Sequence, residues 1–169
     1  PLICSGMRTS PAKPTRRTPC FDSLEQEAFL NLWRTFDRLR GVEDELFGRY
    51  ALTAQQYNVL RLLRAADPAG IPTLSLAQRL VSRAPDITRM LDPLERRGLI
   101  TRLRSDRDRR SVQVGITPAG IELLDEMNEP LQACHTRQLG HLTVAQLREL
   151  IALLRTAREP HEGPESHWS

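Results

Sequence analysis

The sequence predicts a mainly α-helical fold with one small β-hairpin. Apolar residues such as Phe29, Leu32 and Phe36 recur at intervals of three and four, which is the spacing along one face of an α-helix. The interval shortens to two in the runs 99–104 and 111–116, and alternation of that kind is typical of strands. The length of 169 residues fits a single domain.

Three helices are expected in the first half of the chain. The first spans roughly 22–48, and the second follows Thr53, whose hydroxyl can cap a helix that begins after it. Thr73 or Ser75 opens a short third helix. A tight turn then leads to the next helical segment.

A fourth helix is expected to start near Pro85 and to stop at Gly98. Proline suits the first helical position, and glycine is favoured just past the C-terminal end. The apolar residues Ile87, Leu91 and Leu94 share one face, so we expect this face to pack inward and the opposite face to stay polar.

The two alternating runs flank a polar segment at 105–110 that is dense in charge. This arrangement predicts a β-hairpin with an exposed basic tip. Thr117 followed by Pro118 starts a fifth helix, since a threonine cap and a proline at the first helical position favour helix initiation. Thr143 caps a last helix.

Positive charge is concentrated in one stretch inside the predicted fold. The net charge is only +3, but residues 79–110 hold ten arginines against five acidic residues. Residues 1–20 carry a charge of +4, and the rest of the chain is acidic, at −6. Such clustering favours a site for a polyanion. The alternative is that the arginines cover a solvated helix face.

A helix that follows a tight turn and precedes a hairpin predicts a winged helix-turn-helix. A major groove about 12 Å wide admits a helix, and a minor groove about 6 Å wide admits an arginine side chain. The candidate DNA contacts are Pro85, Asp86, Thr88 and Arg89 on the fourth helix, Arg107, Arg109 and Arg110 at the hairpin tip, and Arg96 and Arg97 at phosphates. Arg96 and Arg97 have an alternative role, which is to pair with Asp92 and Glu95 on the protein surface.

The chain resembles the MarR family of bacterial transcriptional regulators over roughly residues 25–158. The resemblance is carried by GLI at 98–100, DRRSV at 108–112 and TPAG at 117–120. It implies a homodimer whose first and last helices form the interface, and a pseudo-palindromic operator bound as double-stranded DNA. It also implies repression that a small ligand releases.

The resemblance also assigns roles to individual residues. Arg110 matches a wing arginine that enters the minor groove, and Asp108 matches the aspartate that holds it in place. Asp86, Thr88 and Arg89 match the base-reading turn. Repression by a ligand-responsive dimer is therefore the expected function.

Pro93 departs from an ordinary recognition helix, because it lies in the middle of the fourth predicted helix. It removes a hydrogen bond to the carbonyl of Arg89, and proline costs about 3 kcal/mol in a helix interior. A kink here would change how the first turn meets DNA. The alternative function is therefore an interaction module of the same fold that has lost specific operator binding.

The three cysteines, Cys4, Cys20 and Cys134, make neither a disulfide framework nor a paired metal site. Cys20 precedes the first helix, so a cysteine redox sensor is a further alternative, although an exposed thiol fits this position better. Cys134 and His135 lack an acid spaced to orient the histidine and a full set of zinc ligands. We interpret Cys134 as a helical surface cysteine and expect no enzymatic activity, cofactor or metal.

Trp33 and Phe36 on the first helix have two interpretations. At helical spacing they fit a hydrophobic core, and together with Tyr57 and Asn58 they could line a pocket for a small aromatic or anionic effector. Asn58 occupies the position where urate-responsive relatives of the family carry an acid, which argues against urate but leaves other anions open.

The sequence predicts one structured domain between two loose ends. No apolar run reaches the roughly 18 residues that a membrane helix needs, and no secretion signal is present, so a cytoplasmic protein without a membrane partner is expected. We interpret residues 1–6, which precede the initiator-like Met7, as a cloning remnant. The boundaries are a flexible arm at 1–20, one domain at 21–159 with a winged helix-turn-helix lobe at 53–117 and dimerisation helices at 22–48 and 118–158, and a flexible tail at 160–169.

Overall fold

The computed structural model describes residues 21–80, 86–104 and 112–163. The chain divides into two compact units, residues 1–36 and 37–169. The described part of the first unit is the beginning of helix α1 (Leu24–Arg49). The N-terminus of α1 is fixed by a local hydrogen bond, in which the Ser23 hydroxyl accepts the backbone N–H of Gln26 at 3.2 Å.

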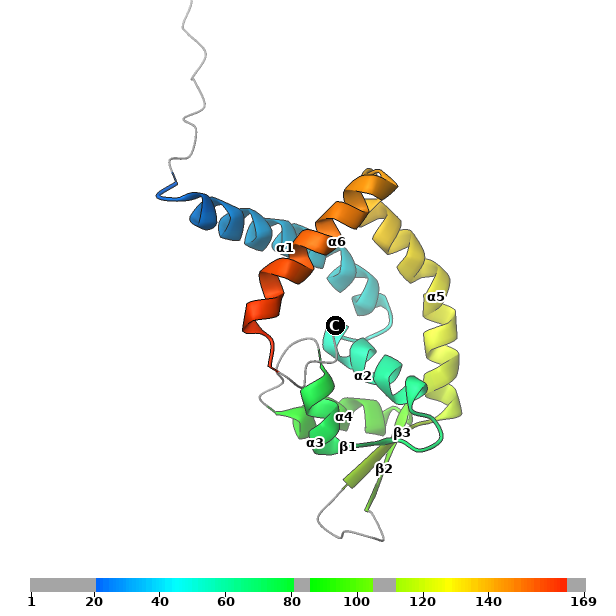
Figure 1. Ribbon diagram of the computed structural model, residues 1–169. Helices are drawn as coiled ribbons and strands as arrows, with labels where there is room; N and C mark the ends of the chain where they lie inside the picture. The colour runs from blue at the N-terminus through cyan, green and yellow to red at the C-terminus, as the bar shows by residue number, and fades with distance from the viewer. Residues whose placement is uncertain (1–20, 81–85, 105–111, 164–169) are drawn as a thin grey trace, which may run out of the picture. The chain divides into compact units, whose positions relative to one another are not determined.

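The described part of the second unit contains the rest of α1, five further α-helices and a small sheet (Figure 1). The fold is therefore mainly helical with a small antiparallel sheet, as the sequence predicts. The elements are α2 (Ala54–Ala65), β1 (Ile71–Pro72), α3 (Thr73–Arg79), α4 (Ile87–Arg96), β2 (Ile100–Arg104), β3 (Val112–Ile116), α5 (Pro118–Leu139), α6 (Val144–Arg158) and a 3₁₀ turn (Glu159–His161).

The sheet has three antiparallel strands in the order β1-β3-β2. Strands β2 and β3 form the predicted hairpin, paired from Ile100 opposite Ile116 to Arg104 opposite Val112. Strand β1 was not predicted, because two residues are too short to show an alternating pattern. It pairs Ile71 with Val114 of β3, which anchors the hairpin to the segment before α3.

The predicted caps start three of the helices. Thr53 and Thr143 each form a capping box, in which the threonine hydroxyl accepts a backbone N–H and a glutamine side chain accepts the N–H of the threonine. Thr117 caps α5 in the same way without the reciprocal bond. Helix α3 begins at Thr73, after Pro72, without a side-chain cap. Gly98 ends the α4 segment at φ +69°, a conformation that favours glycine.

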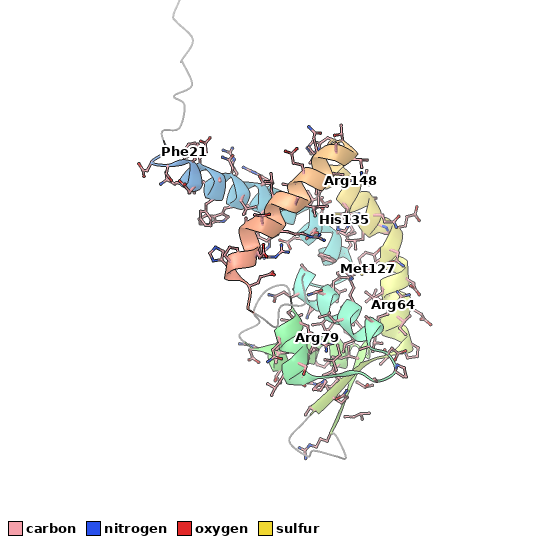
Figure 2. The ribbon with its side chains drawn as sticks, in the orientation of Figure 1. Phe21, Arg64, Arg79, Met127, His135 and Arg148 are labelled. Atoms are coloured by element: carbon pink, nitrogen blue, oxygen red, sulfur yellow. The ribbon has the colours of Figure 1, made fainter. Side chains whose placement is uncertain are left out.

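The hydrophobic core lies between α2, α3, α4, the sheet and α5, with the end of α1 added to it. Met127 of α5 is fully buried where α5 passes α2, and Arg64 of α2 pairs with Asp125 at 2.7 Å on the same side (Figure 2). The buried core residues are Phe47, Leu52, Val59, Leu60, Leu63, Ile71, Leu76, Leu80, Leu91, Leu94, Leu99, Ile100, Val114, Ile116, Leu124 and Met127.

Two helices show a different surface. Helix α6 has no buried residue, and large apolar side chains of α6 and of the N-terminal part of α1 are exposed. No helix in the described ranges is long and apolar enough to cross a membrane.

Candidate nucleic-acid interface

Helix α4 presents one apolar and one polar side, as predicted. Leu91 and Leu94 are fully buried, and Ile87 packs against the core. Thr88 and Arg89 in the first turn are exposed. The first turn of α4 therefore has the exposure that a DNA-reading segment needs.

Asp86 is exposed and also caps the N-terminus of α4. Its Oδ1 accepts the backbone N–H of Arg89 at 3.0 Å, so Asp86 is the N-cap of α4. A capping carboxylate stabilises the unpaired N–H groups and the positive end of the helix dipole. The carboxylate thereby fixes the start of α4.

Pro93 does not end α4. The helix continues from Ile87 through Pro93 to Arg96, and the backbone N–H of Arg97 bonds to the carbonyl of Pro93 at 3.2 Å. Residues on both sides of the proline thus belong to one helix, and the buried face of Leu91 and Leu94 is continuous.

Arg97 forms hydrogen bonds that its position in the sequence did not suggest. Its guanidinium donates to the carbonyl oxygens of Ala51 at 2.7 Å and Tyr50 at 3.0 Å. Both carbonyls lie in the turn after α1, where Ala51 adopts φ +50°. Arg97 therefore joins the end of α4 to the end of α1. Arg96 is exposed.

Asp92 and Glu95 of α4 pair with Arg102 rather than with Arg96 and Arg97, the alternative partners expected from the sequence. Arg102 lies on β2, and its guanidinium donates to Asp92 at 2.6 Å and to Glu95 at 2.8 Å. These hydrogen bonds raise the pKa of Arg102, with Glu95 contributing most. Period-two alternation from buried Ile100 could have indicated that Arg102 faces inward.

Several predicted DNA contacts lie outside the described residues. The structure describes the hairpin up to Arg104 on β2, which is exposed, and from Val112 on β3. The predictions for Pro85 and for the tip residues Arg107, Asp108, Arg109 and Arg110 therefore stay predictions, as does that for Cys20.

The four residues of the predicted effector pocket are found in both units. Trp33 and Phe36 belong to the first unit and are 62% and 59% exposed, so they are not part of a hydrophobic core among the described residues. Tyr57 and Asn58 belong to the second unit and are half-buried. The Tyr57 ring lies 5.1 Å from the Phe47 ring, and burial raises the pKa of the tyrosine. The shared pocket stays a prediction.

A different hollow, of about 220 Å³, lies between the second half of α1 and α5. Its lining is apolar around Leu46, Pro130 and Cys134, with Arg49 and Arg137 at the edge. Both arginines pair with Glu45, at 2.9 and 3.6 Å. None of the four predicted pocket residues contributes to it.

Cys134 corrects one expectation, because it is buried rather than on the surface. Only 8% of the residue is exposed, since α5 packs against α1 here, and the Gln138 amide donates to the Leu39 carbonyl at 2.9 Å one turn further along. Burial raises the pKa of the Cys134 thiol, which disfavours the reactive thiolate. Within the described ranges, no three His, Cys, Asp or Glu residues are grouped to hold a metal ion.

Helices α2 to α4 and the β2–β3 hairpin lie close together (Figure 1), and their apolar residues share one core. Thr88, Arg89 and Arg96 of α4 are exposed. This order and arrangement define a winged helix-turn-helix protein, a class in which one helix enters a DNA groove. We call α4 the recognition helix and the β2–β3 hairpin the wing.

Comparisons with known proteins identify the family. Residues 52–112 match the sequence model of the MarR family. The crystal structure of a MarR transcription factor from Planctomyces limnophilus is 52% identical, with a TM-score of 0.65, and covers 81% of this chain and 99% of that one. The chain belongs to the MarR family, which consists of DNA-binding transcription regulators rather than enzymes.

Other relatives are more distant but cover most of the chain. A MarR mutant from Escherichia coli, solved with operator DNA, is 26% identical, with a TM-score of 0.70, over 80% of this chain and 99% of that one. BpsR of Bordetella bronchiseptica, whose DNA binding is regulated by 6-hydroxynicotinic acid, is 25% identical, with a TM-score of 0.65, over 78% and 98%. The transcriptional repressor IacR of Pseudomonas putida is 26% identical over 90% of this chain and 94% of its own length.

Proposed function

We propose that this protein is a ligand-responsive repressor that acts in the cytoplasm and binds a pseudo-palindromic operator as a homodimer. The observation that carries the proposal is the exposed first turn of the recognition helix, which Asp86 caps and from which Thr88 and Arg89 reach solvent beside the wing. Repression is supported by the similarity to IacR of Pseudomonas putida, which is a transcriptional repressor.

In this proposal, the recognition helix reads the major groove. Arg89 donates two hydrogen bonds to a guanine edge, and Thr88 and Asp86, together with Pro85, shape the contact at the first turn. Arg96 contacts phosphate. Arg97 is not among the phosphate contacts of this proposal, because its guanidinium donates to the carbonyl oxygens of Tyr50 and Ala51.

The wing reads the minor groove in the same proposal. Arg110 enters the groove, Asp108 orients it, and Arg107 and Arg109 contact the neighbouring phosphates. A narrow minor groove concentrates negative potential, so it favours an inserted arginine.

The homodimer is supported by apolar surface that a single chain leaves exposed. In the first unit Phe29 and Trp33 of α1 are exposed, and in the second unit Ile151 and Leu153 of α6 are exposed. Exposed apolar side chains that lie close together on one helix are typical of a protein interface. A two-fold dimer would place two recognition helices about 34 Å apart, one turn of DNA.

Ligand response is supported by the relative BpsR, whose DNA binding 6-hydroxynicotinic acid regulates. We propose a small aromatic or anionic effector and a pocket that includes Trp33, Phe36, Tyr57 and Asn58. An effector that binds better to a dimer with another helix spacing lowers DNA affinity by the difference in its binding free energies.

The test is fluorescence anisotropy with DNA from upstream of the protein's own gene, against scrambled DNA, over a series of salt concentrations. The wild type should bind its own DNA more tightly than scrambled DNA. Arg89→Ala and Arg110→Ala should each lose about 1–3 kcal/mol of specific binding. The matched control is Arg61→Ala, which removes the same charge from an exposed position on α2 and should leave binding unchanged.

Weak binding that is equal for both DNA sequences and disappears at physiological salt would overturn the proposal, because it would leave only a basic surface. It would favour the interaction module. With selective binding established, the same assay tests 6-hydroxynicotinic acid and other aromatic carboxylates for release of the DNA.

A further inference from the structure

Arg102 is the central residue of a link between the wing and the recognition helix. It lies in the middle of β2, opposite the buried residue Val114 of β3. The β-strand alternation therefore turns its side chain toward the inner face of the sheet, where only 19% of the side chain is exposed.

Two carboxylates of α4 receive this guanidinium. Nε donates to Oε2 of Glu95 at 2.8 Å, Nη2 donates to Oδ1 of Asp92 at 2.6 Å, and Nη2 also contacts Oε2 of Glu95. Asp92 and Glu95 are three residues apart, so they lie on the same side of the helix. The planar guanidinium thus bonds to two points along the axis of α4. Two bonds fix the direction of β2 relative to α4 as well as the distance between them.

We propose that Arg102 is a positioning residue for operator recognition, which holds the wing at a fixed angle to the recognition helix so that both reach their grooves together. Its guanidinium faces the helix rather than solvent, so it acts through α4 and the wing and does not contact DNA. The inference rests on the proposed operator recognition.

The physical reason is that simultaneous readout of two grooves requires a fixed geometry. The polypeptide joining α4 to β2 includes Gly98, a residue with few conformational restrictions. Ile100 and Val114 in the core hold the base of the wing. Without the Arg102 link, the part of the wing beyond this base could change its angle to the helix, and ordering it on DNA would reduce the specific affinity. Non-specific binding depends mainly on phosphate contacts and does not need this angle.

The test removes either the arginine on β2 or the two acids on α4, so that the same hydrogen bonds are lost with opposite changes of charge. Arg102→Gln removes one positive charge, and the double variant Asp92→Asn with Glu95→Gln removes two negative charges. Each is compared with wild type for binding to DNA from upstream of the gene and to scrambled DNA. The matched control is Arg104→Gln, two residues along the same strand, where the side chain is exposed.

Both link variants should reduce the ratio of specific to non-specific affinity by roughly tenfold. Arg104→Gln should lower both affinities together and leave the ratio near that of wild type. In addition, amide hydrogen exchange in β2 should accelerate in the link variants of the DNA-free protein and not in Arg104→Gln. Circular dichroism verifies that each variant is folded. If Arg102→Gln does not fold, the double variant alone tests the link.

Two results separate the inference from the function on which it rests. A wild type that binds scrambled DNA as tightly as its own would overturn the proposed operator recognition. A selective wild type with unchanged selectivity and unchanged β2 exchange in both link variants would overturn the role of Arg102 alone. The role of Arg102 would also be overturned if Arg102→Gln weakened binding to both DNA sequences and the double variant strengthened binding to both, because charge alone would then explain the result.

Discussion

The winged helix-turn-helix lobe buries its apolar side chains within the chain, whereas α6 and the start of α1 leave theirs exposed. In the lobe, side chains from α2, α3, α4 and all three strands meet in one core, and Leu60, Leu91 and Leu94 are fully buried. In α6, no residue is buried, although Leu147, Leu150 and Leu154 recur at intervals of three and four, the spacing of one helix face.

The difference shows that an amphipathic sequence predicts a buried face without saying which chain covers it. The lobe covers its own apolar residues, so its stability is a property of one chain. The exposed apolar residues of α6 and of the start of α1 need a second surface, which the proposed homodimer supplies. Stability and assembly should therefore respond to different substitutions.

The largest effect is expected from a cavity in the lobe. Leu94→Ala removes a fully buried side chain of the recognition helix, and the lost contacts and the resulting cavity should lower the free energy of unfolding by about 2–5 kcal/mol. Urea denaturation measures this change. The control is Leu74→Ala in α3, where the leucine is 79% exposed and the expected change is within about 0.5 kcal/mol. Equal effects would contradict the assignment of the core.

A smaller effect, on assembly rather than folding, is expected in α6. Ile151→Ser combined with Leu153→Ser replaces two exposed apolar side chains and should weaken the dimer by about 2–4 kcal/mol, because their burial at the interface is lost. Sedimentation equilibrium measures the association. Leu74→Ser, an exposed leucine outside these helices, is the control. An unchanged dimer in the double variant would place the interface elsewhere.

The two capping boxes offer a matched pair with an effect of about 1 kcal/mol. Thr53→Ala removes the cap of α2 in the lobe, and its cost should appear in the unfolding of the single chain. Thr143→Ala removes the same cap from α6, and its cost should appear mainly in the dissociation of the dimer. Urea denaturation at two protein concentrations distinguishes them. If the free energies of unfolding of the two variants depended on protein concentration in the same way, the expected difference between the lobe and α6 would be wrong.

The smallest effect concerns the reactivity of Cys134. In a Cys4→Ser and Cys20→Ser background, the native protein should react with iodoacetamide at pH 8 at least several-fold more slowly than the unfolded protein. Burial raises the pKa of the thiol, so less thiolate is present at a given pH. Mass spectrometry follows the labelling. Equal rates in native and unfolded protein would mean that α1 does not cover this residue.

The order of helices and strands could be predicted because each element carries a local signal. The caps at Thr53, Thr117 and Thr143, the glycine at Gly98 and the period-two runs of the hairpin all depend on neighbouring residues. Local signals of this kind are independent of the tertiary structure, so the sequence is sufficient for them.

The missed features depend on residues far apart in the sequence. Arg97 bonds to the carbonyl of Ala51, 46 residues away, and Cys134 is buried because α5 packs against α1. The pairing of Arg102 with two acids of α4 had a partial signal in the strand alternation, but its partners depend on how the wing packs. Side-chain contacts of long range need the fold before they can be assigned.

The bonds of Arg97 have one further consequence, because both of their acceptors are main-chain carbonyl oxygens. The connection between the end of the recognition helix and the turn after α1 therefore does not depend on the side chains at positions 50 and 51. A substitution of the Tyr50 side chain should leave both bonds in place, whereas Arg97→Ala removes them together.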